Sequence, residues 1–486
     1  MEVGHLLVET FVGERLFPTT GARVVVRCDL GIQHHEVFTD ENGRSEKIPL
    51  SAAHRDTTHR TPHGNLPEIY PKRYTVEVSH KRGFQTTIVH GVEIFPGIVS
   101  ILPVRSRSAT PGSDEIYEIF IPCRREADLH DRSSHEETVI GHSNENILSS
   151  SLVVPPHITV HMGQPDEEAE TLVVSLKEYV KNVASGENNP SWEDAALGAN
   201  ILMQMSVALD RISDNRSRNS GRNFDITNRP GHGSAFVPGR NTFNNVSRIV
   251  DELWGLRVIE KDGRMMPPND AFRHSARNLA LRGYNPAQII NYICPHHTVS
   301  GFHGPYSPYP GFILREGTVS DRVSDMQGRL NRISRNWRIP PTGALDGVYG
   351  PRTEASVYAF QKAFGLPQNG AIDKCTWSEI IDISENMEKF GEPSLPGERF
   401  ASGEGSEGFA GAPGAVGAAS RVDEKETFEE SDTERAETAE QGETPFSEEI
   451  STDTSQTNYS TAEAVSHSVN PAMLLALGLS SRRRWY

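Results

Sequence analysis

Histidine and cysteine side chains can bind metal ions or act as nucleophiles, and this sequence contains 19 histidines and four cysteines. The cysteines, at positions 28, 123, 294 and 375, are far apart and form no CxxC pair. Neither a disulfide framework nor a cysteine zinc site is therefore indicated, and we expect reduced, structural thiols.

The histidines do not show the spacing of a metal site either. His157 and His161 are four residues apart in a segment that reads as a strand, which puts them about 13 Å apart, too far for one ion. His296 and His297 are adjacent and diverge. The other histidines considered lie in loops without a companion at fixed spacing, namely His34, His35, His54 and His59. We expect no metal and no cofactor, and we find no HExxH, nucleophile elbow or phosphate-binding glycine loop.

Two adjacent carboxyl groups, Glu193 and Asp194, precede an Ala- and Leu-rich run that continues to Ile212. The run predicts a long buried helix, and Ser191 can serve as its N-cap. Carboxylates in the first turn of a helix complement its dipole, which is a sufficient reason for both residues on the sequence alone.

A turn followed by a helix occurs twice near residue 350. Residues 345–350, LDGVYG, contain two glycines and precede Thr353 and an amphipathic run from 354 to 364. Residues 368–377, QNGAIDKCTW, repeat the order of turn, spacer, threonine and helix. An earlier helix over 322–333 has an apolar face, and the three predict a compact helical domain.

This pattern resembles the peptidoglycan-binding-domain family in Met326-Gln327, Asp346 to Gly350, Thr353, Phe360-Gln361, Gly365-Leu366, Asn369-Gly370 and Thr376-Trp377. Asn369 in place of Asp and Asp373 in place of Gly are mild departures. The resemblance implies a three-helix domain over 320–385 that binds peptidoglycan. Hydrogen bonds or a ring face for sugar and stem-peptide groups would come from Asp346, Tyr349, Arg352, Thr353, Gln361 and Trp377, although Trp377 could instead belong to the core.

The elements before this domain differ in kind. Residues 1–105 contain segments of β-branched residues separated by turns such as 39–43, TDENG, and they resemble the transthyretin-like or carboxypeptidase-regulatory β-sandwich. Residues 106–151 are polar and read as a linker, a preferred site of proteolytic cutting. Residues 152–315 are rich in predicted helices, so we expect a multidomain α+β protein with an α-rich middle domain.

Composition excludes several classes of function. The 486 residues carry a formal net charge of −17, which argues against a nucleic-acid partner. No apolar run is long enough to span a bilayer, and the N-terminus does not show the usual pattern of a signal peptide. Residues 392–486 are acidic and poor in large apolar side chains, so we expect a disordered tail there.

The middle segment resembles the clostridial spore cortex-lytic enzyme family in PPHITVHMG, in the helix after PSWEDAALG, in FVPGRNTFNNVSRIVDELW and in RGYNPAQIINYI. The resemblance implies a lytic-transglycosylase-like domain at 152–315, a pro-region removed by a protease near residues 148–153, and Glu193 or Asp194 as the catalytic acid. This chain departs from the family at that acid, at 232–235 and at 269–275, stretches expected to line the sugar cleft.

Three functions follow from these patterns. The first is a spore cortex-lytic protein of sporulation and germination that cleaves the muramic acid–glucosamine bond of the cell wall. The second is a non-catalytic peptidoglycan-binding protein of the spore or cell envelope with a degenerate catalytic domain. The third is a structural spore or envelope protein recruited through its acidic tail. The expected partners are peptidoglycan and an activating protease.

Overall fold

The computed structural model describes residues 2–13, 15–28, 33–52, 59–61, 64–80, 83–110, 115–122, 154–213, 221–228, 236–260, 268–301 and 309–390. The expected acidic tail at 392–486 and the expected cleavage stretch at 148–153 lie outside these ranges. The described residues belong to one compact unit with a mixed α/β fold. Among the helices that the structure describes, none is both long and apolar enough to cross a membrane.

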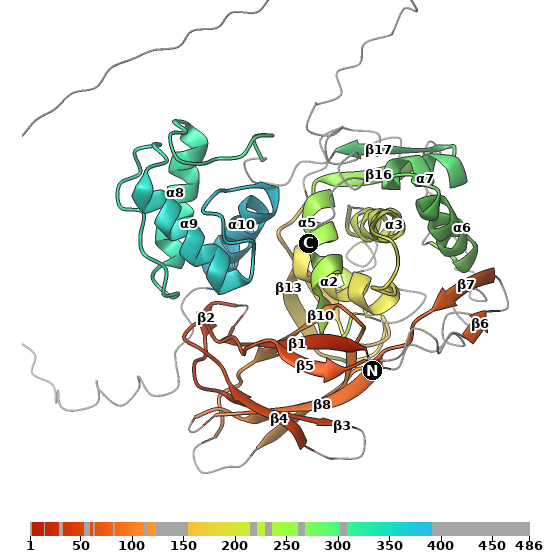
Figure 1. Cartoon of the computed structure of the whole chain (residues 1–486), viewed down its shortest axis with the longest axis horizontal. Helices are drawn as coiled ribbons and strands as arrows, with labels where there is room; N and C mark the ends of the chain where they lie inside the picture. Colours follow the sequence, from red (N-terminus) through yellow and green to blue (C-terminus); the bar gives the residue numbers. More distant parts are fainter. Residues whose placement is uncertain are drawn as a thin grey trace, which may run out of the picture. The chain divides into compact units, whose positions relative to one another are not determined.

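The N-terminal strands form two sheets (Figure 1). One sheet has the order β15-β10-β1-β2, with β5 also paired to β1. Its strands are β1 (Val3–Val12), β2 (Phe17–Pro18), β5 (Ile48–Ser51), β10 (Val99–Arg105) and β15 (Thr242–Phe243). The other sheet has the order β11-β9-β8-β3-β4. Its strands are β3 (Arg23–Cys28), β4 (Gln33–Phe38), β8 (Lys72–Ser79), β9 (Thr86–Ile94) and β11 (Ile116–Phe120). A hairpin of β6 (His59–Thr61) and β7 (Gly64–Glu68) lies apart from both.

A common core joins the two sheets. In β8 the side chains of Tyr74, Val76 and Val78 are buried while their neighbours are not, the alternation expected of a strand with one face inward. They belong to the same apolar cluster as Leu6 and Leu102 of the first sheet. The strands predicted from β-branched segments over residues 6–95 therefore form.

Two strands come from outside the segment predicted to form this module. β11 lies within the expected linker and pairs in parallel with β9 through an alternating segment, IYEIF. β15 comes from the middle of the chain and pairs with β10. Beside it, Asn241 accepts a hydrogen bond from the amide of Glu93 (3.3 Å) and donates one to its carbonyl (3.2 Å). The N-terminal sheet is thus completed by a later part of the chain.

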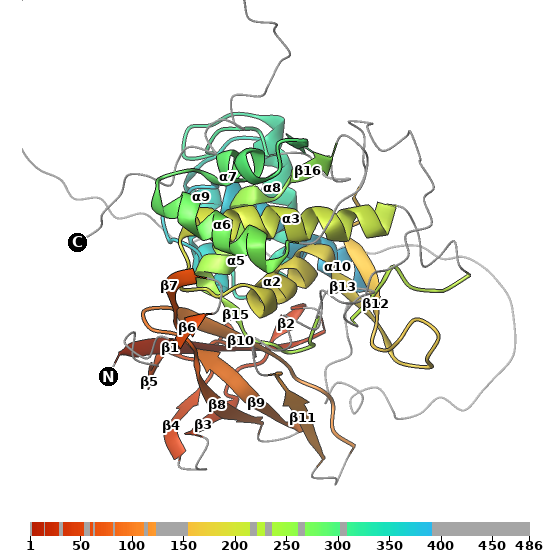
Figure 2. The same ribbon diagram turned by 90° about the vertical axis from the view of Figure 1, so that its right-hand side faces the viewer.

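The middle of the chain is built around one long helix, α3 (Asp194–Ser213). Figures 1 and 2 show α3 surrounded by α2 (Leu176–Glu187), α5 (Asn244–Leu253), α6 (Asp270–Leu281) and α7 (Pro286–Ile293). A small sheet joins β12 (His157–His161), β13 (Thr171–Ser175) and β14 (Ile226–Thr227), and a hairpin joins β16 (Leu256–Glu260) and β17 (His297–Gly301). The expected buried helix is confirmed, because Ala196, Ala199 and Leu202 are fully enclosed.

One local expectation for this segment is wrong. Ser191 does not cap α3: its hydroxyl donates to Asn189 Oδ1 (2.7 Å), and the first helical hydrogen bond runs from the Leu197 amide to the Glu193 carbonyl. Residues 171–175, TLVVS, form β13 and pair with β12, directly before α2. The helix then begins with Ser175 as its N-cap.

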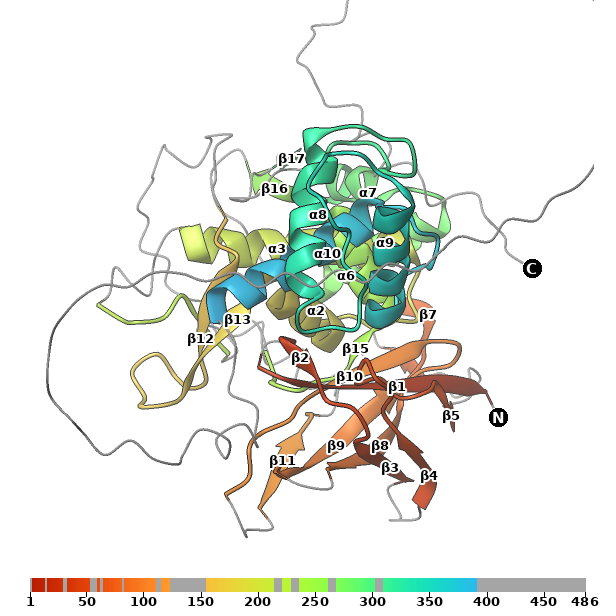
Figure 3. The same ribbon diagram turned by 90° about the vertical axis from the view of Figure 1, so that its left-hand side faces the viewer.

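The C-terminal helices α8 (Asp321–Ile333), α9 (Pro351–Phe364) and α10 (Lys374–Phe390) pack together (Figure 3). Val323, Met326, Leu330 and Ile333 of α8 are fully buried, as are Val357 and Phe360 of α9. Short β-bridges, Val319 with Val348 and Leu314 with Ile372, fasten the turns to the chain before α8. The predicted three-helix domain is confirmed.

Buried charges connect α10 with α2 and α5. Glu379 of α10 lies 3.3 Å from Lys181 Nζ and 3.1 Å from an Arg15 guanidinium nitrogen. Asp251 of α5 lies 3.2 Å from the same Lys181. Burial alone would raise the pKa of Glu379, but Lys181, Lys177 and Arg15 outweigh it and lower that pKa to about 2. The C-terminal domain is therefore attached through paired, desolvated charges.

Candidate functional site

The first turn of the C-terminal domain is organised by a buried glutamine, Gln327 of α8. Its Nε2 donates to Asp346 Oδ1 (2.9 Å), to the Val348 carbonyl (3.1 Å) and to Thr353 Oγ1 (3.2 Å). Its Oε1 accepts from the Gly347 amide (3.1 Å). Gly347 has a φ of 71°, which glycine adopts without strain. One amide group thus fixes the turn and the start of α9 together.

Gln361 of α9 organises the second turn in the same way. Its Nε2 donates to Asn369 Oδ1 (2.9 Å), to the Ala371 carbonyl (2.8 Å) and to Thr376 Oγ1 (3.3 Å), and its Oε1 accepts from the Gly370 amide (2.9 Å). Asn369 stands where the first turn has Asp346, and both accept from the amide two residues on. The two predicted half-repeats are therefore equivalent in hydrogen bonding as well as in sequence.

Four of the six residues predicted to contact peptidoglycan are buried. Tyr349 and Gln361 are 0% exposed, and Thr353 and Trp377 are 2% exposed. Tyr349 joins the two turns by donating its hydroxyl to the Gly370 carbonyl (2.6 Å). These side chains brace the turns from inside, so their direct contribution is to the shape of the domain.

Asp346 and Arg352 are exposed. The hydrogen bonds that Asp346 accepts from the Gln327 side chain and from the Val348 amide hold its pKa below the usual range. The ionised Asp346 carboxylate therefore stabilises the turn through these two hydrogen bonds. Of the six predicted residues, Arg352 is the exposed one that forms no ion pair with the described residues.

A pocket of about 590 Å³ opens on the same domain, between α8, the residues before Asp346 and the end of α10. Its lining is polar and rich in arginine: Ser324, Asp325, Gly328, Arg329, Asn331, Arg332, Arg335, Leu345 and Glu388. None of these residues is among the predicted contacts. The sequence signal for the pocket is a spacing of three residues: Arg329 and Arg332 lie in the last turns of α8, and Arg335 lies just beyond its end.

The predicted catalytic acids lie at the start of α3 and point to different helices. Glu193 Oε2 lies 3.9 Å from Arg277 Nε of α6, and this oxygen is buried without a hydrogen-bond donor among the described residues. Asp194 Oδ2 instead accepts a hydrogen bond from Arg248 of α5 (2.6 Å). Arg277 also lies over the Trp192 ring, 5.1 Å from its centroid. The structure therefore separates two acids that the sequence could not distinguish.

Another acid, Glu187, which sequence reasoning missed, faces the same helix α6 as Glu193. Glu187 at the end of α2 accepts a hydrogen bond from Gln204 Nε2 (2.9 Å) and lies 4.0 Å from Arg273 of α6. Arg273 and Arg277 are one helical turn apart, so α6 directs one arginine toward each acid. No motif in the sequence connects these four residues, because they come from three helices.

The histidines and cysteines considered as metal ligands do not come together in the part of the chain that the structure describes. His157 Nε2 lies 2.8 Å from Asn386 Oδ1, and the His161 ring stacks on Phe224. No disulfide joins Cys28, Cys294 and Cys375, the cysteines that the structure describes. His54 and the side chains of His34 and His59 lie outside the description. Within the described residues, no group of three or more His, Cys, Asp or Glu side chains could hold a metal ion.

Comparison with known proteins identifies the C-terminal domain. Residues 319–380 match the family model described as "Putative peptidoglycan binding domain". The zinc D-Ala-D-Ala carboxypeptidase of Streptomyces albus G is 33% identical over 76 residues. That stretch covers 15% of this chain and 28% of the relative, so this chain spans little more than a quarter of the carboxypeptidase. No solved structure matches. This chain therefore carries a peptidoglycan-binding domain, as predicted.

Proposed function

We propose that this protein binds peptidoglycan through residues 319–380 and acts at the cell wall, in the spore or cell envelope. The observation that carries the proposal is the family match over a domain whose two turns are both fixed by an enclosed glutamine. The zinc D-Ala-D-Ala carboxypeptidase of Streptomyces albus G, which this chain matches over 76 residues, is named for its action on D-Ala-D-Ala.

Co-sedimentation of the full chain with purified sacculi tests this proposal. We expect the chain to pellet with sacculi and to stay in the supernatant with cellulose, a polysaccharide without peptide stems. Recovery of the chain in the supernatant with sacculi from spores and from vegetative cells alike would refute it.

We further propose a lytic transglycosylase activity of the cortex-lytic type in the middle domain, with the N-terminal module as a transthyretin-like β-sandwich pro-region. Glu193 is the better of the two candidate acids. Its side chain is 34% exposed, so substrate can reach it, and its buried oxygen has no described donor. Asp194 pairs with Arg248 at 2.6 Å and is 48% exposed, and it has no enclosed oxygen of the kind found in Glu193. One positioned carboxyl group can protonate a leaving oxygen and then assist ring closure.

Digestion of spore cortex peptidoglycan, analysed by mass spectrometry for 1,6-anhydromuramic products, tests the activity. We expect Glu193→Gln to abolish the products and Asp194→Asn to keep most of them. If the wild-type chain binds sacculi but releases no product before or after removal of the N-terminal module, the protein is the non-catalytic binder instead. Retained activity in Glu193→Gln would reject Glu193 as the acid.

A further inference from the structure

The lining of the arginine-rich pocket of the C-terminal domain includes a glycine, Gly328. Gly328 lies in the interior of α8, where glycine lowers helix stability relative to alanine. A Cβ at this position would first meet a methyl group of Leu345, 3.9 Å away, so packing does not require glycine here. The missing side chain instead leaves room between α8 and Leu345, whose own side chain is 58% exposed.

The wall opposite α8 is held in place. Asn331 Nδ2 donates to the Gly343 carbonyl (3.0 Å), and Ser324 Oγ donates to the Leu345 carbonyl (3.2 Å). The segment that carries Leu345 is therefore fastened to the helix at two points, one on each side of Gly328. The pocket is formed before any ligand arrives, which reduces the entropy lost on binding.

Charge in the pocket favours an anion. Three guanidinium groups line it against two carboxylates. Arg329 is committed to Asp325 (3.2 Å) and Glu385 (2.8 Å). Arg335 has no carboxylate partner among the described residues. Arg332 pairs with Glu388 at 2.8 Å, but both side chains are largely exposed, at 41% and 63%. An exposed pair of this kind contributes little stability, so an incoming carboxylate can replace Glu388.

From this arrangement we propose that the pocket binds the alanine-terminated carboxylate of a peptidoglycan stem peptide, an inference that rests on the proposed function. Arg335 and Arg332 receive the carboxylate, because guanidinium groups match its two oxygens. The space above Gly328, beside Leu345, accepts the methyl group of the terminal alanine. The domain then recognises the peptide of the wall, with no need to contact its glycan.

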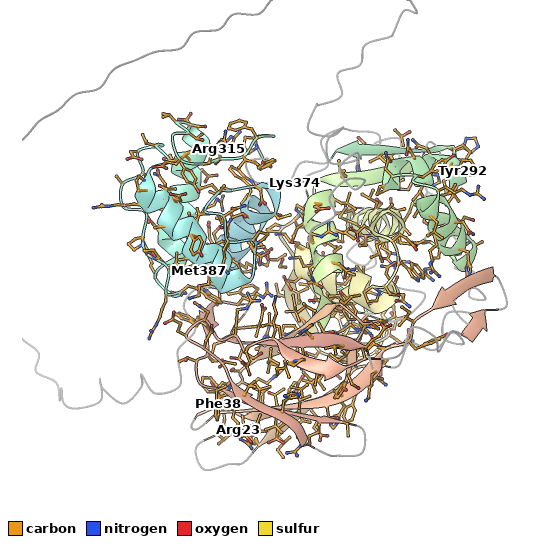
Figure 4. All side chains as sticks on the ribbon, in the orientation of Figure 1. Arg23, Phe38, Tyr292, Arg315, Lys374 and Met387 are labelled. Carbon is orange, nitrogen blue, oxygen red and sulfur yellow. The ribbon has the colours of Figure 1, made fainter. Side chains whose placement is uncertain are left out.

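Binding of the full chain to sacculi, with soluble competitors, tests this assignment. We expect the stem pentapeptide ending in D-Ala-D-Ala to displace the chain, and its C-terminal carboxamide to bind at least about tenfold more weakly. Peptide-free glycan strands should not compete. Arg332→Ala combined with Arg335→Ala should lose binding to sacculi. Arg315→Ala should keep it, because this exposed arginine precedes the matched domain and does not line the pocket (Figure 4).

Gly328→Leu provides a variant that fills the pocket without removing a charge. Because α8 gains a better helix former and the new Cβ has room, its melting temperature should not fall. Loss of sacculus binding in this stable variant would support the pocket as the site. If the wild-type chain binds sacculi and Gly328→Leu or the double arginine variant binds as well, the pocket is not the site and the proposed function stands. If the wild-type chain does not bind sacculi, the proposed function fails and this inference fails with it.

Discussion

Replacing Gln327 with glutamate tests whether one side chain holds the first turn of the peptidoglycan-binding domain. The change keeps the size of the side chain and the acceptor for the Gly347 amide, but it replaces the Nε2 donor with an oxygen. That oxygen would face Asp346 Oδ1 and the Val348 carbonyl, at the 2.9 and 3.1 Å now spanned by hydrogen bonds. The Thr353 hydroxyl can rotate and donate, so its contact survives.

The expected cost follows from enclosing a carboxylate where the amide donor is lost. The exposed Asp346 carboxylate can turn to water, whereas position 327 is enclosed, with Gln327 only 2% exposed. The new carboxylate would therefore be a buried charge without a cation, which costs about 3–5 kcal/mol. Because 1.4 kcal/mol corresponds to a factor of ten, the turn should open roughly a hundredfold to several thousandfold more often.

Hydrogen exchange of the full chain, measured by mass spectrometry on peptides covering residues 346–350, reports this opening. The exposed Gln368→Glu is the matched control and should change stability by less than about 0.5 kcal/mol. The double variant Gln327→Glu with Asp346→Asn has a new amide donor at position 346, where the second turn already has Asn369. It should recover about half of the lost stability. Exchange unchanged between Gln327→Glu and the wild type would refute the role of Gln327.

Two other perturbations have defined expectations. Glu379→Gln leaves Lys181 and Arg15 buried with one partner fewer, and it should lower the free energy of unfolding by about 3–5 kcal/mol in thermal or urea unfolding. The control Glu252→Gln removes an exposed pair with Arg248 and should cost less than about 1 kcal/mol. Equal effects of the two variants would show that the buried charges do not hold α10. Burial lowers the pKa of His80 to about 4, so the folded state disfavours its protonation and stability should fall as the pH drops from 6.5 toward 4. His80→Gln should flatten this part of the melting-temperature profile, and an unchanged slope would contradict the assignment.

The C-terminal domain could be predicted in detail because its signals are local. A glycine turn, a threonine and an amphipathic run follow one another within about twenty residues, and each half-repeat is complete in itself. The sequence does not show whether a polar side chain points into the domain or toward solvent. Gln361 and Tyr349 read as candidate ligand contacts, yet their polar atoms are used by the backbone of the turns. The sequence did not predict the pocket, because Gly328 and Leu345 are separated in sequence and become neighbours only when α8 packs against the first turn.

In the rest of the chain, the sequence does not show which distant segments come into contact. The β-branched segments predicted the strands of the N-terminal sheets. They did not predict that β15, at residues 242–243, pairs with β10, because no local pattern indicates a partner so far away in the sequence. Glu193 and Asp194 are equivalent in sequence, both acidic and both at a helix start. They differ in the structure because consecutive helical residues diverge by about 100°, which turns one toward α6 and the other toward α5.

The most direct measurement of the central claim is hydrogen exchange of the full chain with and without solubilised peptidoglycan. We predict slower exchange in peptides from residues 319–390, the matched domain with the end of α10 that borders the pocket. Peptides from 154–301 should change less at the concentration that saturates this domain. No change in any peptide of 319–390 while the chain pellets with sacculi would contradict the claim that this domain binds the wall.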